Sequence, residues 1–170
     1  MHEFANEERK SAGFTIRAAQ EIDVPVILQL IRELAEYERL LHEVTATEAG
    51  LRQRLFGARP YAEALVAEVD ESAAGFALFF HNFSTFLGKP GVYLEDIFVR
   101  PEYRGRGIGT AFFRQLAQLA LERDCGRLEW AVLNWNEPAL KFYRSLGAAS
   151  MSDWTVQRVT GEGIKRLAQM

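Results

Sequence analysis

Apolar and polar residues alternate along this chain with two different periods, one typical of strands and one typical of helices. Residues 13–19 predict a short first strand. The next segment, residues 21–41, predicts a helix, because apolar side chains recur there at i, i+3, i+4 and i+7. These side chains are Ile27, Leu30, Ile31 and Leu34. A helix with such a stripe packs that face against a core.

Cap and turn signals divide the segment that follows. Thr45 and Glu48 have the spacing of a capping box and predict a second helix that ends near Gly57. Residues 62–70 and 72–83 are two apolar, β-rich runs with a short polar turn between them. This arrangement predicts a β-hairpin.

The second half of the chain predicts strands that alternate with helices. A strand over residues 92–100 is followed by a loop and by a helical pattern over residues 108–124. Residues 127–135 are again apolar and β-rich, and they predict another strand.

The end of the chain carries clear helix signals and a weaker strand signal. Asn136 is placed to cap a helix that has Pro138 in its first turn and Gly147 beyond its end. Residues 152–159 predict a last strand, and residues 162–170 a weak terminal helix. The order β-α-α-β-β-β-α-β-α-β predicts an α/β fold, with a mixed sheet and helices on both faces.

Composition limits the class of protein. The chain has 170 residues and a net charge of −3, which argues against a general nucleic-acid-binding protein. Its apolar runs are far shorter than the roughly 20 residues of a membrane helix. The single cysteine excludes an intramolecular disulfide and favours a reducing, cytoplasmic compartment.

Residues 1–11 are polar, so we expect a disordered tail before one domain over residues 12–170. The three histidines lack metal-ligand spacing, so no metal is expected.

A glycine-rich basic loop stands between the strand at 92–100 and the helix that follows. Its backbone N–H groups and the positive end of the helix favour a bound phosphate, and its glycines allow close approach. It lacks the lysine of a Walker loop, and Thr110 stands where the dinucleotide fingerprint has its third glycine. Taken alone, the loop equally fits a flexible turn with solvated arginines. Its residues are Arg104, Gly105, Arg106, Gly107, Ile108 and Gly109.

Three blocks together resemble a known family. Arg104-x-x-Gly107-x-Gly109 after an apolar strand resembles the pyrophosphate motif of the GNAT superfamily of acetyl-CoA-dependent N-acetyltransferases. With the blocks at 30–40 and 134–148, the chain is similar to the diamine and thialysine acetyltransferase branch over residues 14–168. The resemblance implies a GNAT fold with a mixed, mostly antiparallel seven-stranded sheet. It also implies acetyl-CoA as donor, a small cationic amine as acceptor, and a homodimer.

The same resemblance implies which residues contact acetyl-CoA. One group offers backbone atoms to the pantetheine and the acetyl carbonyl, a second forms the phosphate loop, and a third lies in the helix capped by Asn136. They are Ile97, Phe98 and Val99; Arg104, Gly105, Arg106, Gly107, Ile108, Gly109 and Thr110; and Asn136, Glu137, Pro138, Ala139 and Tyr143.

Two adjacent acids interrupt the apolar strand at 92–100. Strict alternation puts Glu95 with Ile97 on one face, and Asp96 with Leu94 and Phe98 on the other. A buried acid needs a partner, so Asp96 either pairs with a nearby arginine or binds substrate. An amine with a pKa of about 10.4 is only about 0.04% neutral at pH 7, so a carboxylate that accepts its proton is useful. The resemblance assigns Glu95 to this base role or to binding the amine.

Tyr143 fits either a structural or a catalytic role. With Ala139 and Leu146 it occupies one face of its predicted helix, which fits a core aromatic with its hydroxyl at the surface. Aminolysis of a thioester expels a thiolate, however, and a phenol with a pKa near 10 can protonate it. The resemblance assigns the general acid to Tyr143.

The resemblance also places residues around the acceptor amine. Tyr37 and Glu38 match residues that line the amine pocket. Ser84 and Phe86 stand where polyamine-specific members carry an acid and a tryptophan, which favours a shorter acceptor than spermine. Two alternatives remain open: a protein lysine or N-terminal acetyltransferase, and a non-catalytic CoA-binding sensor. A sensor needs neither an acid nor a base, so Tyr143 and Glu95 argue against it.

Overall fold

The structure is a computed structural model that describes residues 13–170, so the expected tail at 1–11 lies outside the described residues. The described chain divides into two compact units, residues 13–131 and 132–170. The first unit holds the sheet and the second holds two helices. Within the described chain, no helix is both long enough and apolar enough to span a bilayer.

The first unit contains a mixed five-stranded sheet. Strands β1 (Thr15–Ala18), β2 (Glu63–Val69), β3 (Ser72–Ser84) and β4 (Lys89–Val99) pair antiparallel in this order. Strand β5 (Leu128–Trp130) pairs with β4 in parallel. The predicted β2–β3 hairpin is confirmed. The expectation of a mostly antiparallel seven-stranded sheet is wrong, because the described residues form five strands in a mixed arrangement.

Two predicted strands differ from the structure. The strand expected at 127–135 is limited to β5, and residues 152–159 form no strand in the described chain. The apolar side chains of that last segment are exposed, with Trp154 at 72% and Val156 at 75%. An alternating pattern forms a strand only when a neighbouring strand pairs with it, and here the described residues supply none.

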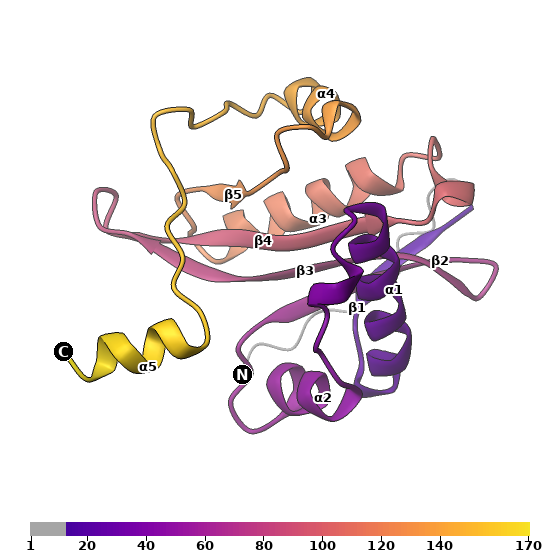
Figure 1. Ribbon diagram of the computed structural model, residues 1–170. Coiled ribbons are helices and arrows are strands. Elements are labelled where there is room, and N and C mark those ends of the chain that lie inside the picture. The colour runs from indigo at the N-terminus through magenta and orange to yellow at the C-terminus, as the bar shows by residue number, and fades with distance from the viewer. Residues whose placement is uncertain (1–12) are drawn as a thin grey trace. The chain divides into compact units, whose positions relative to one another are not determined.

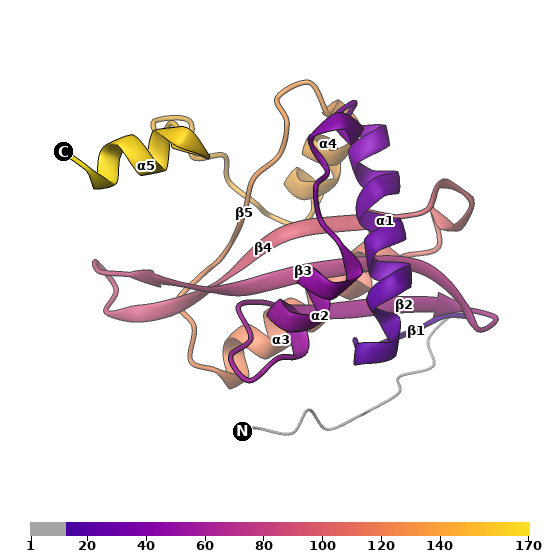
Figure 2. The same cartoon turned by 60° about the horizontal axis from the view of Figure 1, so that its bottom comes forward.

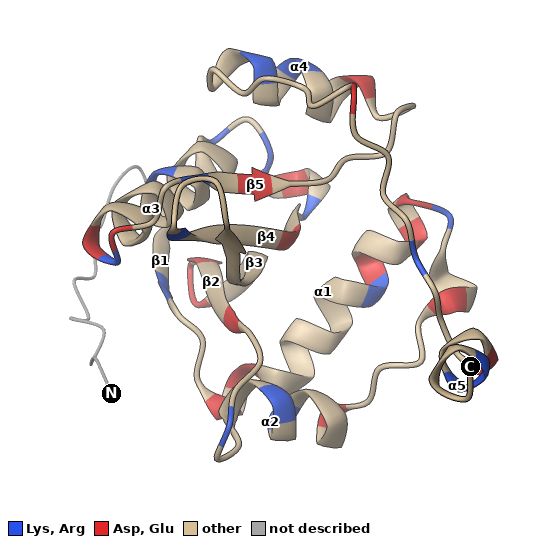
Figure 3. Ribbon diagram, turned by 90° about the vertical axis from the view of Figure 1, so that its left-hand side faces the viewer, with Lys and Arg blue, Asp and Glu red and all other residues tan. Residues whose placement is uncertain are grey.

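Helices cover both faces of the sheet, as Figures 1 and 3 show. Helix α1 (Val24–Tyr37) lies on one face, and α3 (Ile108–Glu122) lies on the other. Ile27 and Leu30 of α1 are fully buried against Phe76 and Phe98, so the predicted apolar stripe is confirmed. Short 3₁₀ helices, Glu21–Asp23, Leu41–Glu43 and Pro101–Tyr103, join these elements.

Two helix starts test the predicted caps. Helix α2 (Glu48–Phe56) is capped by Thr47, whose hydroxyl accepts a hydrogen bond from the Gly50 N–H at 3.1 Å. The predicted cap at Thr45 is therefore wrong by two residues. In the second unit, α4 (Glu137–Ser145) begins as predicted, with the Asn136 side chain accepting from the Ala139 N–H at 3.3 Å. Helix α5 (Glu162–Ala168) confirms the terminal helix.

A β-bulge at Glu95 changes which face the acids occupy. Leu94 pairs with Phe79 and Asp96 pairs with Leu78, so Glu95 is an extra residue in β4. Because Leu78 and Phe79 point to opposite faces, so do Asp96 and Leu94. The expectation that these two residues share a face is therefore wrong. Asp96 lies on the face that α1 covers.

Figures 1 and 2 show β3 and β4 as a long hairpin whose tip lies away from α1. At the other end of this hairpin, β3 approaches the β4 backbone closely at Gly75. A Cβ added to Gly75 would lie 2.3 Å from the Phe98 carbonyl oxygen. Only glycine fits this contact without moving β4.

Gly75→Ala should therefore lower the free energy of unfolding by about 1–3 kcal/mol, the usual cost of overpacking. Urea denaturation measures the change. Ser72→Ala, at an exposed position of the same strand, is the control and should stay within about 0.5 kcal/mol of the wild type. Equal stability of the two variants would contradict the close contact.

Candidate active site

Three carboxylates gather where α1 ends beside the bulge of β4. Glu38 is the C-cap residue of α1, Asp96 faces α1 from β4, and Glu95 is the bulged residue itself. Asp96 and Glu38 are half-buried, and Glu95 is exposed. The structure thus brings together three of the predicted substrate-binding residues.

The cluster is electrostatically unfavourable. Burial, with a smaller effect from the negative charges of Glu95 and Glu38, raises the pKa of Asp96 to about 6. Burial also raises the pKa of Glu38. Each shift shows that the site disfavours the ionised acid while it contains no added cation.

No ion pair to Asp96 occurs in the described part of the chain, so the alternative of an arginine partner is not what the structure shows. The nearby Arg100 is instead committed to Glu33, with Nε–Oε2 and Nη2–Oε1 distances of 2.8 Å. An anionic site of this kind attracts a cation from solution. Among residues 13–170, no group of His, Cys, Asp or Glu side chains is arranged to hold a metal ion.

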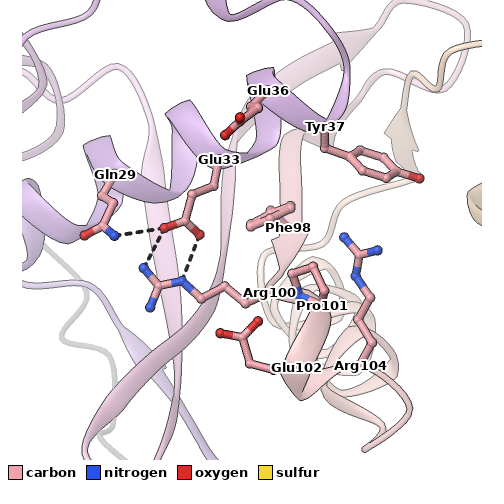
Figure 4. Close-up of a pocket in the computed structure, with 9 residues that line it drawn as sticks. All are labelled: Gln29, Glu33, Glu36, Tyr37, Phe98, Arg100, Pro101, Glu102 and Arg104. Atoms are coloured by element: carbon pink, nitrogen blue, oxygen red, sulfur yellow. Dashed lines mark hydrogen bonds and ion pairs between the residues drawn. The ribbon is translucent and has the colours of Figure 1, made fainter.

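An open pocket of about 560 Å³ lies next to the end of α1 (Figure 4). Tyr37, a predicted acceptor residue, lines it together with Phe98 and Arg104. The Arg104 guanidinium lies 5.1 Å from the centre of the Tyr37 ring and 5.7 Å from that of Phe98, which are cation–π distances. Its Nε donates to the Val99 carbonyl at 2.9 Å.

Sequence reasoning missed the Glu33–Arg100 pair in this pocket. The signal available was weak: Glu33 lies four residues before Tyr37 on α1, and Arg100 directly follows β4. Pairing between a helix and a strand 67 residues apart depends on the tertiary fold.

The predicted phosphate loop has the geometry that its glycines require. Gly105 and Gly107 have φ of +76° and +85°, and Gly107 is the N-cap residue of α3. A Cβ at either position would meet open space, so backbone conformation, not crowding, favours glycine there. The first N–H groups of α3 have no acceptor within the helix. The loop therefore fits the pyrophosphate of acetyl-CoA.

The edge of β4 fits the rest of that ligand. Strand β5 pairs with β4 only at Val92, Tyr93 and Leu94. Beyond Leu94, no strand of the described residues pairs with β4 on the side away from β3. Ile97–Val99, the predicted pantetheine contacts, lie on this unpaired stretch. Peptide groups there suit the amides of a pantetheine arm, as in strand addition at a sheet edge.

Ser84 and Phe86 are not brought to the acids within this chain. Ser84 ends β3, where its buried hydroxyl accepts from the Leu87 N–H at 3.3 Å. Phe86, in the hairpin tip, is 94% exposed. Leu78 pairs with Asp96, and Ser84 lies six residues further along β3. Ser84 is therefore roughly 20 Å from Asp96.

The remaining predicted residues belong to the second unit. Asn136, Glu137, Pro138 and Ala139 form the capped start of α4, and Tyr143 lies near its end. The rings of Phe142 and Tyr143 are 5.6 Å apart, in a tilted arrangement. The N-terminal turn of α4 offers N–H groups and a positive dipole end, consistent with an anionic ligand.

Comparisons with known proteins identify the family of this chain. The sequence profile of the acetyltransferase (GNAT) family matches residues 27–148. A thialysine N-epsilon-acetyltransferase of Bos taurus is 42% identical over 90% of this chain and 96% of its own length. An L-ornithine N5-acetyltransferase of Arabidopsis thaliana is 32% identical over 91% of this chain and 88% of its own. An integron cassette protein of V. cholerae has a TM-score of 0.79 at 26% identity, covering 94% of this chain and all of that one. The resemblance given by the three sequence blocks is confirmed.

Asp96→Asn should stabilise the folded protein at neutral pH. The folded-state pKa of about 6 exceeds the ordinary value of 3.8, so the folding penalty is absent below pH 4 and complete above pH 6. With about 1.36 kcal/mol for each pKa unit, the variant should gain about 2–3 kcal/mol at pH 7. Urea denaturation at pH 4 and pH 7 measures this difference.

Asp23→Asn is the control with the opposite sign. Burial acts to raise the pKa of Asp23, but hydrogen bonds from Arg17 and the Gln20 N–H outweigh it, and the net pKa is lowered. This acid stabilises the fold above its unfolded-state pKa, so removing its charge should destabilise the protein at pH 7. If Asp96→Asn were also destabilising at pH 7, the conflict among the three acids would be disproved.

Proposed function

The chain belongs to the GNAT family of acetyltransferases, and from this premise we propose that it transfers acetyl from acetyl-CoA to the primary amine of a small cationic acceptor. The observation that carries the proposal is the group of three carboxylates, Glu38, Glu95 and Asp96, beside the β4 bulge. A bound ammonium ion would relieve their mutual repulsion. A neutral acceptor would leave it in place.

The names of the relatives support an acceptor of this kind. Thialysine and ornithine, named for two of them, are amino acids whose side chains end in a primary amine. The preference for a short acceptor over spermine rests on the family resemblance at Ser84 and Phe86, because this chain does not bring these two residues to the acids. We therefore propose a thialysine-like or lysine-like amino acid, or a short diamine, as the substrate. A cytoplasmic homodimer, implied by the resemblance, stays a prediction.

The acids serve both binding and proton removal in this proposal. They hold the ammonium by charge, and one of them accepts its proton, directly or through water, so that the nitrogen can attack the acetyl carbonyl. Asp96 is suited to accept the ammonium proton, because a carboxyl group with a pKa of about 6 holds a proton more readily than an ordinary aspartate does. Glu95, assigned this role by the resemblance, is the alternative base.

The other assigned residues bind the donor and complete the proton balance. Acetyl-CoA supplies the activated acetyl thioester. The phosphate loop holds its anionic part, and Ile97–Val99 orient the pantetheine arm. The resemblance also assigns the start of α4 to contacts with this ligand. The nitrogen loses two protons as the ammonium becomes an amide, and the acid takes the first of them. As the carbon–sulfur bond breaks, Tyr143 gives its phenol proton to the leaving thiolate, and the second amine proton returns to the Tyr143 oxygen, directly or through water.

Tyr143→Phe should lower kcat about 10²-fold, within the range of general acid catalysis, because the thiolate then leaves without its proton donor. Steady-state kinetics with a thiol-release assay measures kcat, and calorimetry should show unchanged acetyl-CoA affinity. Phe142→Leu, at the adjacent aromatic position, is the control and should keep most of the activity. Wild-type kcat in Tyr143→Phe would remove the acid assignment.

The acceptor assignment is tested with a panel of amines in the same assay. We expect kcat/KM for thialysine or a short diamine to be at least about ten times that for spermine, since one charge pair contributes a few kcal/mol. Preference of the wild type for spermine would refute the short acceptor, and transfer only to peptides would favour a protein acetyltransferase.

A further inference from the structure

The ion pair between Glu33 and Arg100 joins three elements of the first unit (Figure 4). Arg100 Nε and Nη2 each donate to one Glu33 oxygen at 2.8 Å, a bidentate fork. Arg100 Nη1 also donates to the Ala73 carbonyl at the start of β3, at 2.8 Å. The Gln29 amide donates to Glu33 Oε1 at 2.9 Å. Helix α1, β3 and the end of β4 therefore meet at one node.

The site residues lie four positions further along the chain from each partner. Tyr37 follows Glu33 by four residues and lies on the same strip of α1. Arg104 follows Arg100 by four residues, and its guanidinium lies over the Tyr37 ring at 5.1 Å. The two contacts thus form successive links between α1 and the loop that leads to α3.

The bidentate ion pair restricts the rotation and sliding of α1 on the sheet more strictly than apolar packing does. Ile27 and Leu30 hold the first half of α1 on the sheet, and the partly buried Leu34 packs against the same core from the second half. Apolar contacts of this kind tolerate small rotations and shifts. Bidentate hydrogen bonds between a guanidinium and a carboxylate are directional. Glu33 lies in the second half of α1, so the fork adds a directional constraint to the turn that carries Tyr37 and Glu38.

We propose that the Glu33–Arg100 ion pair positions the acceptor wall, formed by Tyr37 and Glu38, against Asp96 and Arg104. This inference rests on the proposed function. In the proposed reaction, neither Glu33 nor Arg100 contacts the reacting atoms. Both are positioning residues, and their effect falls on the acceptor more than on acetyl-CoA.

Glu33→Gln breaks the charge complementarity of the fork while keeping its shape. We expect the KM of the acceptor amine to rise about 5- to 10-fold, because the wall that meets it shifts. The KM of acetyl-CoA and kcat should stay within about twofold of the wild type. Steady-state kinetics in the full chain, with thialysine varied and then acetyl-CoA varied, gives all three constants.

The chain supplies a matched control in the Arg123–Glu63 pair. This pair is also bidentate: Arg123 Nη1 donates to Glu63 Oε1 at 2.5 Å and Nη2 donates to Oε2 at 2.9 Å. It joins the end of α3 to β2. Its side chains are 30% and 29% exposed, against 18% and 29% for Arg100 and Glu33. Glu63→Gln should therefore lower Tm about as much as Glu33→Gln does, but it should leave the KM of the acceptor amine unchanged.

Arg100→Lys is the second variant, since it keeps the charge but loses the fork, and it should raise the amine KM in the same way. An unchanged amine KM in Glu33→Gln, or an equal rise in Glu63→Gln, would overturn the positioning role while leaving acetyl transfer intact. A parallel loss of kcat and acetyl-CoA affinity would overturn it too. A wild type that acetylates no amine would reject both the proposed function and this inference.

Discussion

Like charges held close together in a partly dry site are the constraint on which the rest of the first unit depends. Glu95 and Glu38 both repel Asp96, and no cation within the described residues pairs with Asp96. The apolar contacts of α1 with the sheet must hold them in place. Buried pairs such as Ile27 with Phe76 supply this stability, since each buried apolar side chain contributes about 1.5–3 kcal/mol. The site is therefore maintained by the core beneath it.

The nearby arginines show how the chain keeps the acids unneutralised. Arg100 is held by Glu33 and a carbonyl oxygen, and Arg104 is stacked on Tyr37 and donates to the Val99 carbonyl. Each guanidinium therefore has partners of its own close to the acids. Such commitments leave the acidic site available for a cation from outside. They also connect the two sides of the proposed reaction, because Arg104 belongs to the phosphate loop and its neighbour Tyr37 to the acceptor wall.

The sequence could predict the features that depend on nearby residues. The stripe of α1, the β2–β3 hairpin and the Asn136 cap all follow from spacings within a few positions, and the structure has each of them. The bulge at Glu95 depends on how β4 meets β3, so alternation along β4 alone assigned Leu94 to the wrong face. The last predicted strand failed for a related reason, since residues 13–170 supply no strand that pairs with it. The gathering of Glu38 with Asp96 was available only through the family resemblance.

The bulge at Glu95 also means that residue count, more than residue type, determines the architecture of this strand. A chain one residue shorter at this point would pair without interruption, and the positions on one side of the cut would exchange inward and outward orientation. Sequence alignments that place a gap here would equate core positions with surface positions. For the engineer, the length of β4 is therefore a fixed dimension of the scaffold.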